Sequence, residues 1–585
     1  MATRVLGLLL SLMVVGTPTL AMDTAVSATS LAITTPITQE TDADETPSEK
    51  DAAAAPKAAA EDAAKGLDEK IDAWFTPIAD WWDKLVLTAI PGLTLGEAGS
   101  SVPIVLAMLV IGAVFFTVYY AFVNIRLFPL AINVVRGKYD ELEGGNEPIT
   151  TDTVNVVDGD VKRTIRDEGD GEVSHFQALA TAVSGTVGLG NISGVAVAVA
   201  TGGPGATFWM IMCGLLGMCT KFVECTLGVK YRDVGEDGTV YGGPMYYLTK
   251  GIGGGFGKVL GIIFAVLCVG ASFGGGNAFQ SNQASKQIIS LFGLTGGSIG
   301  FILGIILAVF VGLVILGGIK RIASVTEKIV PLMAIIYVLA CIVIICMNLQ
   351  HVGTAFSQII SGAFTPQAGL GGLVGVLLVG FQRAAFSNEA GAGSAAIAHS
   401  AVKTKFPASE GIVALLEPFI DTVVICTMTA LVIVFFNIDG TVFDYGNTAD
   451  SKVTLTAPVE GQPAAIGGVD LTSAAFESQI SWFPKILTIA VCLFALSTMI
   501  SWSYYGLQAW KFLFGKTKAA DITFKVLFLI FIVIGASVKL DAVIKFSDAM
   551  ILALVFPNMV GLIILAPKVK EELGKYLGAI RSSKS

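Results

Sequence analysis

The feature that most constrains this chain is a glycine-rich octapeptide, Ser184 to Asn191, inside an apolar segment. It reads Ser-Gly-Thr-Val-Gly-Leu-Gly-Asn and lies within the hydrophobic run 176–200. Each glycine costs about 1 kcal/mol relative to alanine in a helix interior. Unpaired backbone groups are costly in lipid, so non-helical backbone occurs there only where it lines a cavity in the protein. The octapeptide therefore predicts a membrane helix that is broken near its middle.

The composition predicts a helical membrane protein. Of the 585 residues, 54% are hydrophobic and 14% are charged, whereas a soluble chain carries about 25% charged residues. Apolar segments of about 20 residues suit membrane-spanning helices and are too long for barrel strands. The eight cysteines form no CxxC pair, so neither a disulfide framework nor a metal knuckle is indicated. The sequence has no catalytic motif and no basic patch, which argues against an enzyme and against a nucleic-acid partner.

The first hundred residues predict an exported start of the chain. Residues 1–21 have the pattern of a signal peptide, with Arg4 before a short apolar run and a small-residue cleavage site. Residues 22–66 are predicted to be a disordered, acidic, exported tail, because their composition cannot build a core. Residues 67–100 begin with tryptophans among charged residues, which predicts an amphipathic segment at the membrane interface.

Eleven membrane spans are predicted. An extra N-terminal helix, 102–123, is followed by a cytoplasmic loop, 124–175, and ten further spans. These ten cover residues 176–200, 205–229, 259–284, 297–317, 326–348, 371–399, 409–437, 480–510, 522–538 and 546–566. Basic residues gather in alternate loops, so the positive-inside rule assigns these loops and the tail 567–585 to the cytoplasm and the mature N-terminus to the outside. We therefore expect a multi-pass protein of the bacterial inner (plasma) membrane.

The ten spans divide into two sets of five, residues 176–348 and 371–566. The first helix of each set is interrupted, in the second set by the string SNEAGAGS at 387–394. Because five is an odd number, the two sets must lie in opposite orientations. Paired interruptions in inverted repeats point to a transport site at the membrane midplane. The expected fold is an all-α polytopic membrane protein with a 5+5 inverted repeat and one extra N-terminal helix.

The first break offers groups for both a cation and an anion. Free carbonyls of Ser184, Thr186 and Val187, with the Asn191 side chain, suit a hard monovalent cation. Three amides at the start of the second half-helix suit a carboxylate, namely those of Gly188, Leu189 and Gly190. The alternative is a packing face of small residues, which does not require polar side chains.

Two further apolar spans carry polar side chains. Ser497, Thr498 and Ser501 put three hydroxyls on one helical face, although such hydroxyls also bond to their own helix. Asn277 and Gln280 are three residues apart and put two amides on one face. Substrate contact and interhelical hydrogen bonding are both open for this amide pair.

Charged side chains inside spans are costly and must face protein or water. Arg383 and Glu389 are six residues apart, so we expect each to have a different partner. The remaining charged residues of this kind lie nearer the helix ends, where structural or gating pairs are expected rather than ligand contacts: Lys221, Glu224, Glu417 and Asp421.

Four segments resemble the alanine or glycine:cation symporter family. They are FQALATAVSGTVGLGNISGVAVAVATGGPGATFWM at 176–210, YGGPMYYL at 241–248, RAAFSNEAGAGSAAIA at 383–398 and FALSTMISWSYYG at 494–506. The similarity extends from about residue 100 to about residue 570. The resemblance implies a leucine-transporter-like inverted repeat with one extra N-terminal helix, and sodium-coupled uptake of alanine or glycine.

The resemblance also implies site residues. The VGLGN string is similar to the first core helix of the sodium:neurotransmitter symporters, which implies a sodium site formed by Ser184, Val187, Ser497, Thr498 and Ser501. Thr186 and Asn191 would belong to a second, substrate-linked position, and Phe273 and Gln280 resemble substrate-pocket positions. The full predicted substrate site comprises Thr186, Gly188, Leu189, Gly190, Asn191, Phe273, Asn277, Gln280, Ser387, Asn388 and Trp502. The sequence departs from the family pattern at Ala384, often glycine, and at Leu189, often threonine.

These observations predict a sodium-coupled importer of small neutral amino acids that resides in the lipid bilayer and needs no cofactor besides the coupling ion. A proton-coupled or exchange-type transporter is the nearest rival. A channel or a sensory membrane protein is the rival of another class. A channel shows no saturable, sodium-dependent accumulation, and a sensor needs a folded signalling domain, which neither tail is expected to form. The sequence does not indicate the oligomeric state.

Overall fold

A computed structural model describes residues 66–583 except for short internal gaps. These gaps are residues 96–99, 144–155, 158–159, 162–170, 236–237, 365–371, 447–450 and 457–463. The predicted signal peptide, 1–21, and nearly all of the predicted acidic tail, 22–66, lie outside the described residues, as does much of the predicted loop 124–175.

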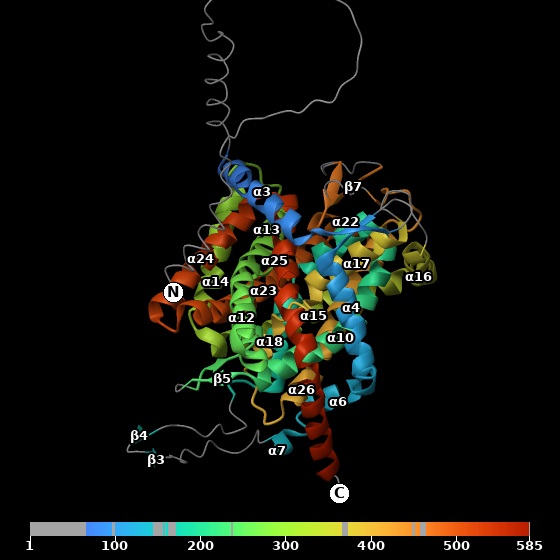
Figure 1. Ribbon diagram of the computed structural model, residues 1–585. Helices are drawn as coiled ribbons and strands as arrows, with labels where there is room; N and C mark the ends of the chain where they lie inside the picture. The colour runs from blue at the N-terminus through green and yellow to red at the C-terminus, as the bar shows by residue number, and fades with distance from the viewer. Residues whose placement is uncertain are drawn as a thin grey trace, which may run out of the picture.

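The described part of the chain is a bundle of long helices (Figure 1). Two of the predicted spans are interrupted, and two others contain short π-helical turns, labelled η. The first half comprises α8 (His175–Thr186), η1 (Gly190–Gly194), α9 (Val195–Gly202), α10 (Gly205–Lys230), α11 (Pro244–Tyr247), η2 (Leu248–Ile252), α12 (Gly254–Phe273), η3 (Gly274–Ala278), α13 (Phe279–Phe292), α14 (Ile299–Ile315) and α15 (Gly318–Met347).

The second half follows a helix at one end of the bundle, α16 (Leu349–Phe364). It comprises α17 (Gly372–Asn388), α18 (Ala395–His399), α19 (Pro407–Val413), α20 (Leu416–Pro418), η4 (Phe419–Cys426), α21 (Thr427–Phe436), α22 (Val469–Gln479), α23 (Phe483–Phe514), α24 (Lys518–Ser537), α25 (Leu540–Ala553) and α26 (Val555–Ser582). Helix α14 packs against α24, α10 against α17, and α12 against α23.

The elements before α8 lie around this bundle. Helix α3 (Leu67–Val86) crosses one end of it, and α4 (Ile104–Tyr119) runs along its side (Figure 1). Three short helices follow: α5 (Val123–Arg126), α6 (Phe128–Val135) and α7 (Asp140–Glu143). The end of the bundle that carries α7 and the C-terminus of α26 is called the α7 end below.

Four antiparallel strand pairs are the only sheets among the described residues. They are β1 (Ala89–Leu95) with β2 (Ser100–Pro103), β3 (Val156–Val157) with β4 (Asp160–Val161), β5 (Asp233–Val234) with β6 (Val240–Tyr241), and β7 (Lys452–Thr454) with β8 (Ala465–Gly467). All of them are short, and the transmembrane architecture is helical.

Each of the eleven predicted spans coincides with one helix or with consecutive helical segments. Within the described residues, seven helices are long and apolar enough to cross a membrane, and α8 with α9 makes an eighth as a bent pair. Helices α4 and α14 are apolar but shorter. The count of eleven spans therefore stays a prediction, whereas the positions of the helices agree with it.

Helix α3 is fastened to the bundle by carboxylates that cap other helices. Asp68 accepts hydrogen bonds of 3.0 and 3.1 Å from two amides in the first turn of α14. Asp72 accepts one of 2.9 Å from the amide of Lys539, directly before α25. Carboxylates are favourable at helix N-termini because free amides and the positive end of the helix dipole meet there.

The two faces of α3 agree with the predicted amphipathic pattern. Phe75 is buried and its ring lies edge-on against that of Phe546 in α25, 4.9 Å between centroids. Trp74 and Trp81 are 58% and 47% exposed. The bundle thus holds one face of α3 and leaves tryptophans on the other, as expected for a helix at a membrane interface.

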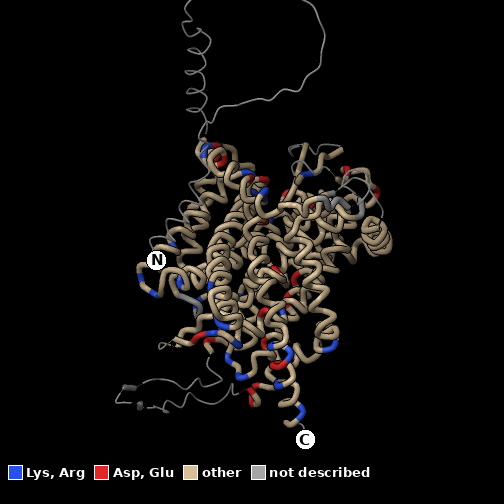
Figure 2. Tube along the Cα trace, in the orientation of Figure 1, with Lys and Arg blue, Asp and Glu red and all other residues tan. Residues whose placement is uncertain are grey.

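Charged residues are concentrated toward the ends of the bundle, but a few acidic ones lie inside it (Figure 2). The buried set includes Glu224, Glu389, Glu410, Glu417 and Asp421. Buried charges require partners, and the partners of these five carboxylates organise the centre of the molecule.

We predict that Phe75→Ala releases α3 from the bundle. The substitution removes a buried aromatic ring, which costs about 3–5 kcal/mol of stability. This loss exceeds the stabilisation that the few capping hydrogen bonds of α3 provide. Trypsin cleavage after Lys84, in the last turn of α3, should become faster in the folded protein. Trp74→Ala, which changes the exposed neighbour, is the control, and equal cleavage of the two variants would contradict this account of α3.

Candidate functional site

The first break lies where the octapeptide predicts it. Helix α8 starts in a capping box, in which Ser174 and Gln177 each bond the other's backbone amide. It ends at Thr186, and the chain turns by 51° before continuing as η1 and α9. The interruption covers residues 187–189, because Gly185, Gly188 and Gly190 make a helical path unfavourable.

Side chains satisfy the amides that the break exposes. The amide of Gly188 donates to Asn191 Oδ1 at 2.9 Å, and the amide of Leu189 donates to Gln280 Oε1 at 2.9 Å. The carbonyl of Val187 accepts no hydrogen bond from any described residue. The break therefore has its amides paired and at least one carbonyl oxygen available.

A cluster of oxygens lies between α8 and α23. The Ser184 hydroxyl donates to the carbonyl of Ser497 at 2.9 Å, and the Thr498 hydroxyl donates to the carbonyl of Ser184 at 3.0 Å. Ser501 donates to the Ser184 hydroxyl at 2.9 Å. All of these residues are buried. Neutral hydroxyl and carbonyl oxygens in this arrangement suit a hard cation and not a soft transition metal.

A second polar cluster surrounds Asp421 in η4. Asn191 Nδ2 donates to Asp421 Oδ1 at 2.5 Å, and the hydroxyls of Ser387 and Thr422 donate to Oδ2 at 2.8 and 2.7 Å. Asn388 joins through Thr422, at 2.9 Å. Asp421 is fully buried and forms no ion pair with any described Lys, Arg or His. This carboxylate therefore links the first break to the end of α17.

The second break separates α17 from α18. Its backbone has positive φ at Glu389 (55°), Gly391 (96°) and Gly393 (82°), and for a residue with a Cβ this conformation is strained. The Gly391 amide donates to Glu224 Oε1 at 2.9 Å, and Trp502 Nε1 donates to Glu389 Oε1 at 3.0 Å. The interruption predicted at residues 387–394 is therefore confirmed, and carboxylates hold it.

The two breaks lie next to each other. A Cβ atom built on Gly190 would be 3.4 Å from the ring of Phe386 and 3.6 Å from Cα of Ser387. Trp502 lies against the backbone of Gly276 in η3, where a side chain would overlap the indole. The two half-helix pairs, α23 and η3 thus surround one small region in the middle of the bundle.

Two predicted substrate residues face elsewhere. Phe273 stacks on Phe531 of α24 with 4.5 Å between ring centroids, and Asn277 Nδ2 donates to the Phe528 carbonyl at 2.7 Å. Only Gln280 of this set reaches the first break. The π-helical turn η3 changes the register between α12 and α13, so residues spaced for one face of an α-helix point in different directions.

Arg383 and Glu389 have separate partners, as predicted. Arg383 forms an ion pair with Asp548 of α25, and Gln382 donates to the same carboxylate at 2.9 Å. Glu389 instead accepts hydrogen bonds from Trp502 and Ser394. The arginine therefore ties α17 to α25, while the glutamate belongs to the second break.

Asp421 is the residue whose role the sequence analysis underestimated. It was expected to form a structural or gating pair, whereas it contacts both breaks. The signal was present as a carboxylate beside Thr422 in the apolar span 409–437. An intramembrane carboxylate without an evident cation is by default a candidate functional group.

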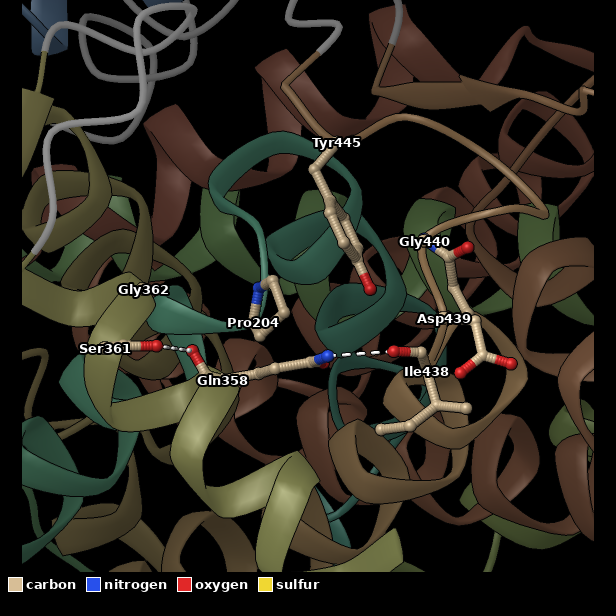
Figure 3. A pocket seen from close by; sticks show the side chains of 9 residues that line it. Pro204, Gln358, Ser361, Gly362, Ile438, Asp439, Gly440 and Tyr445 are labelled. Carbon is tan, nitrogen blue, oxygen red and sulfur yellow. Dashed lines mark hydrogen bonds between the residues drawn. The ribbon is translucent and has the colours of Figure 1, made fainter.

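A surface pocket of about 360 Å³ lies away from both breaks (Figure 3). It lies between α16 and the segment after α21, and the hydroxyl of Tyr445 points toward it. The Gln358 amide closes one side by donating to the Ile438 carbonyl at 2.9 Å. The lining residues are Pro204, Gln358, Ser361, Gly362, Asn437, Ile438, Asp439, Gly440 and Tyr445. None of them is a predicted site residue.

Comparison with known proteins gives the family. Residues 94–585 match the sequence profile of the sodium:alanine symporter family. The chain belongs to the sodium:alanine symporter family. The sodium/alanine symporter AgcS of Methanococcus maripaludis is 37% identical to it over 472 residues, which are 80% of this chain and 93% of that protein. The probable sodium/glutamine symporter GlnT of Bacillus subtilis is 34% identical over 407 residues, 69% and 78% of the two chains.

Membership in the sodium:alanine symporter family confirms the resemblance on which the sequence analysis relied. It makes the chain a multi-pass membrane transporter of a sodium-coupled amino-acid symporter family and not an enzyme. Among solved structures, MhsT in complex with L-phenylalanine is similar at 15% identity and a TM-score of 0.46, covering 68% of this chain and 99% of that one. A manganese transporter of Eremococcus coleocola has 16% identity and a TM-score of 0.45, covering 67% and 78%.

We predict that Gly188→Ala strongly reduces transport because it disturbs the first break. An added Cβ would lie 3.0 Å from Gln280 Oε1 and closer still to the Thr498 hydroxyl, so both polar partners would have to move. Gly194→Ala is the matched control, because nothing lies within 4 Å of a Cβ there. Sodium-dependent amino-acid uptake at equal membrane content should fall at least tenfold for the first variant and stay within twofold for the second. Similar uptake by both variants would contradict this.

Proposed function

We propose that this protein imports alanine, or a similarly small neutral amino acid such as glycine, together with sodium by alternating access. The observation that carries the proposal is a pair of adjacent helix breaks lined by buried oxygens and amides. Backbone groups freed at such breaks bind ions and the ionic groups of substrates in membrane transporters. Membership in a sodium-coupled amino-acid symporter family supports the same reading.

Sodium binds between α8 and α23 in this proposal. Its ligands are the carbonyls of Ser184, Val187 and Ser497 and the hydroxyls of Thr498 and Ser501. The hydroxyls of Thr498 and Ser501 now donate to the carbonyl and the hydroxyl of Ser184, at 3.0 and 2.9 Å, and they rotate to turn their lone pairs toward the ion. A hydroxyl has two lone pairs besides its proton, so this rearrangement requires no movement of the backbone.

The amino acid binds beside the ion, at the first break. Its carboxylate faces the amide of Gly190, and it replaces Gln280 Oε1 as the acceptor for the Leu189 amide. The half-helix that begins with η1 adds the positive end of its dipole there. The side chain of the amino acid lies toward the apolar surface of Leu189 and Phe386. A Cβ placed on Gly190 would lie 3.4 Å from the Phe386 ring, and this closeness favours a substrate side chain no larger than a methyl group.

Asp421 supplies a full negative charge for a cationic group at this point. A buried carboxylate that only accepts hydrogen bonds is stabilised further by a cation. The ammonium group of an amino acid and a second sodium ion share the required chemistry. Asn191 and Ser387, which bond to Asp421, bring that charge to both breaks at once.

Coupling follows because one broken helix contributes to both binding positions. Ion and substrate then stabilise the same conformations, which is the thermodynamic requirement for coupling. A potential of about 100 mV supplies about 2.3 kcal/mol per sodium ion, which is roughly a fifty-fold concentration ratio. We propose that the two five-helix sets, 176–348 and 371–566, form the inverted repeat that rocks around this position, with the N-terminal side outside the cell.

The direct test is uptake of labelled alanine by proteoliposomes. We expect accumulation that saturates with alanine, requires an inward sodium gradient and rises with an inside-negative potential. Potassium in place of sodium, and a proton gradient without sodium, should each leave only background uptake. Accumulation driven by protons alone would favour the proton-coupled alternative, and non-saturable flux would favour a channel.

We predict that Thr498→Ala raises the sodium concentration needed for half-maximal uptake. The variant removes one oxygen ligand while leaving the alanine contacts in place, so we expect an increase of at least fivefold. Ser503→Ala, on the same helix, is the control, because among the described residues that hydroxyl bonds only to the Ile500 carbonyl of its own helix. A sodium curve that is unchanged in Thr498→Ala would remove this residue from the ion site.

A further inference from the structure

Six buried ionisable side chains form an unbroken line of contacts between the α7 end and the middle of the bundle. In order they are Glu143, His175, Glu410, His399, Glu417 and Lys221, and they are called the ionisable chain below. Glu143 Oε2 is 2.8 Å from His175 Nε2, and His175 Nδ1 contacts Glu410 Oε2. Glu410 Oε1 is 2.5 Å from His399 Nδ1, whose Nε2 is 3.5 Å from Glu417 Oε2. Glu417 Oε1 is 3.1 Å from Lys221 Nζ.

The ionisable chain joins the tips of both broken helices. His175 is the first residue of α8, and His399 is the last residue of α18. Glu410, in α19, contacts both imidazoles. The segments around them are also bonded through the backbone, since Lys403 donates to the Val173 carbonyl at 2.9 Å. The α7-end halves of the two broken helices are therefore held together by this line of side chains.

The geometry fixes the protonation state of the imidazoles. Both ring nitrogens of His175 and Nδ1 of His399 lie within hydrogen-bond distance of a carboxylate oxygen, whereas His399 Nε2 lies 3.5 Å from Glu417 Oε2, an ion-pair contact without a hydrogen bond. A neutral imidazole has one N–H and one lone pair, so it would set that lone pair against a carboxylate. Only an imidazole that is protonated on both nitrogens presents a positive N–H to both of its carboxylate neighbours. With the tips of α8 and α18 in contact, each histidine therefore carries one extra proton.

The sum of the charges in the ionisable chain also indicates one extra proton on each histidine. The ionisable chain has three carboxylates and one ammonium, with all six side chains at most 8% exposed. Two further positive charges make it neutral, and a net charge of −2 in a low-dielectric interior is costly. For Glu143, burial alone would raise the pKa, but hydrogen bonds from His175, Tyr576 and Thr404 outweigh it and lower the pKa.

Other titratable groups face the ionisable chain from every packed element. Tyr576 of α26 donates to Glu143 Oε1 at 2.6 Å, and Arg232 donates to the carbonyls of Ser400 and Val402 beside His399. The further groups are Glu224 and Cys225 of α10, Glu389 of the second break and Tyr505 of α23.

We propose that the ionisable chain is a proton-binding site that closes the α7 end of the transport path, taking up two protons when the tips of α8 and α18 come together and releasing them when they separate. This goes beyond the proposed sodium–alanine symport, because it assigns a second ligand, the proton, to residues outside the sodium and substrate positions. The protons reside on His175 and His399. By the predicted orientation they come from the cytoplasm.

The direction of the pH effect follows from linkage. Histidine exposed to water has a pKa of about 6.5, so the separated state loses these protons above that pH. The state in which the tips of α8 and α18 are together keeps both protons. This closed state is therefore favoured at low pH and becomes less stable as the pH rises above about 6.5. Each proton changes the closed-to-open ratio by up to tenfold per pH unit.

A cysteine reporter at Ala178 tests the proposal without any transported substrate. Ala178 is fully buried at the α7 end of α8, where it packs with Val173 and Val402. The reporter is introduced into full-length Cys346→Ser protein in lipid nanodiscs, since Cys346 is exposed. Maleimide labelling in sodium-free buffer is normalised to that of free N-acetylcysteine at the same pH. We expect the normalised rate to rise at least tenfold from pH 6 to pH 8.

Four further variants make the experiment decisive. His399→Gln and, independently, His175→Gln should each reduce this rise markedly, and the double variant should reduce it to less than twofold. Glu572→Gln should keep the full rise, because its ion pair with Lys230 lies at the same end of the bundle but outside the ionisable chain. No rise in the parent protein, or an equal rise in the double variant, would overturn the proposal. Failure of alanine uptake would not affect this readout, so the two proposals fail separately.

Discussion

Everything in this structure depends on satisfying the backbone groups that two broken helices expose inside an apolar bundle. At the first break the partners come from different helices. The Leu189 amide bonds to Gln280 of α13, the Ser184 carbonyl to Thr498 of α23, and the Asn191 carbonyl to Thr429 of α21. Each buried group left unpaired would cost about 1–3 kcal/mol. The interruption of one helix therefore fixes the positions of three others around it.

Different kinds of side chain pair the exposed backbone groups of the two breaks. Neutral hydroxyls and amides surround the first break, and a hydroxyl can exchange a carbonyl partner for an ion by rotating. The second break is held by the carboxylate of Glu224 and the amide of Asn558, which both bond to Gly391. These partners belong to α10 and α26, so two other helices hold the Gly391 peptide in place. The first break is thus suited to exchanging ligands, and the second to keeping its shape.

The sequence predicted the helix positions and both interruptions because their causes are local. Glycines and polar residues in an apolar run disfavour a helix wherever the run packs. It did not predict which way Phe273 and Asn277 point, because the π-helical turn between them resets the direction of each side chain. The position of Asp421 was equally hidden, since its partners are 230 and 34 residues away. Contacts of this kind depend on tertiary packing, which one sequence does not specify. The count of spans stays a prediction for a related reason, because several helices are shorter than the membrane is thick.

One segment connects the middle of the bundle with its α7 end. Glu410, Glu417 and Asp421 follow one another within α19, α20 and η4, and a helical rise of about 1.5 Å per residue puts roughly 16 Å between the first and the last. Asp421 contacts both breaks in the middle of the bundle, while Glu410 contacts the histidines at the tips of both broken helices. A cation that binds beside Asp421 and a proton that binds beside Glu410 therefore act on the same segment and the same two helices. Linkage requires that such effects be reciprocal, so under these two proposals the affinity for a cation beside Asp421 depends on the protonation of the α7 end.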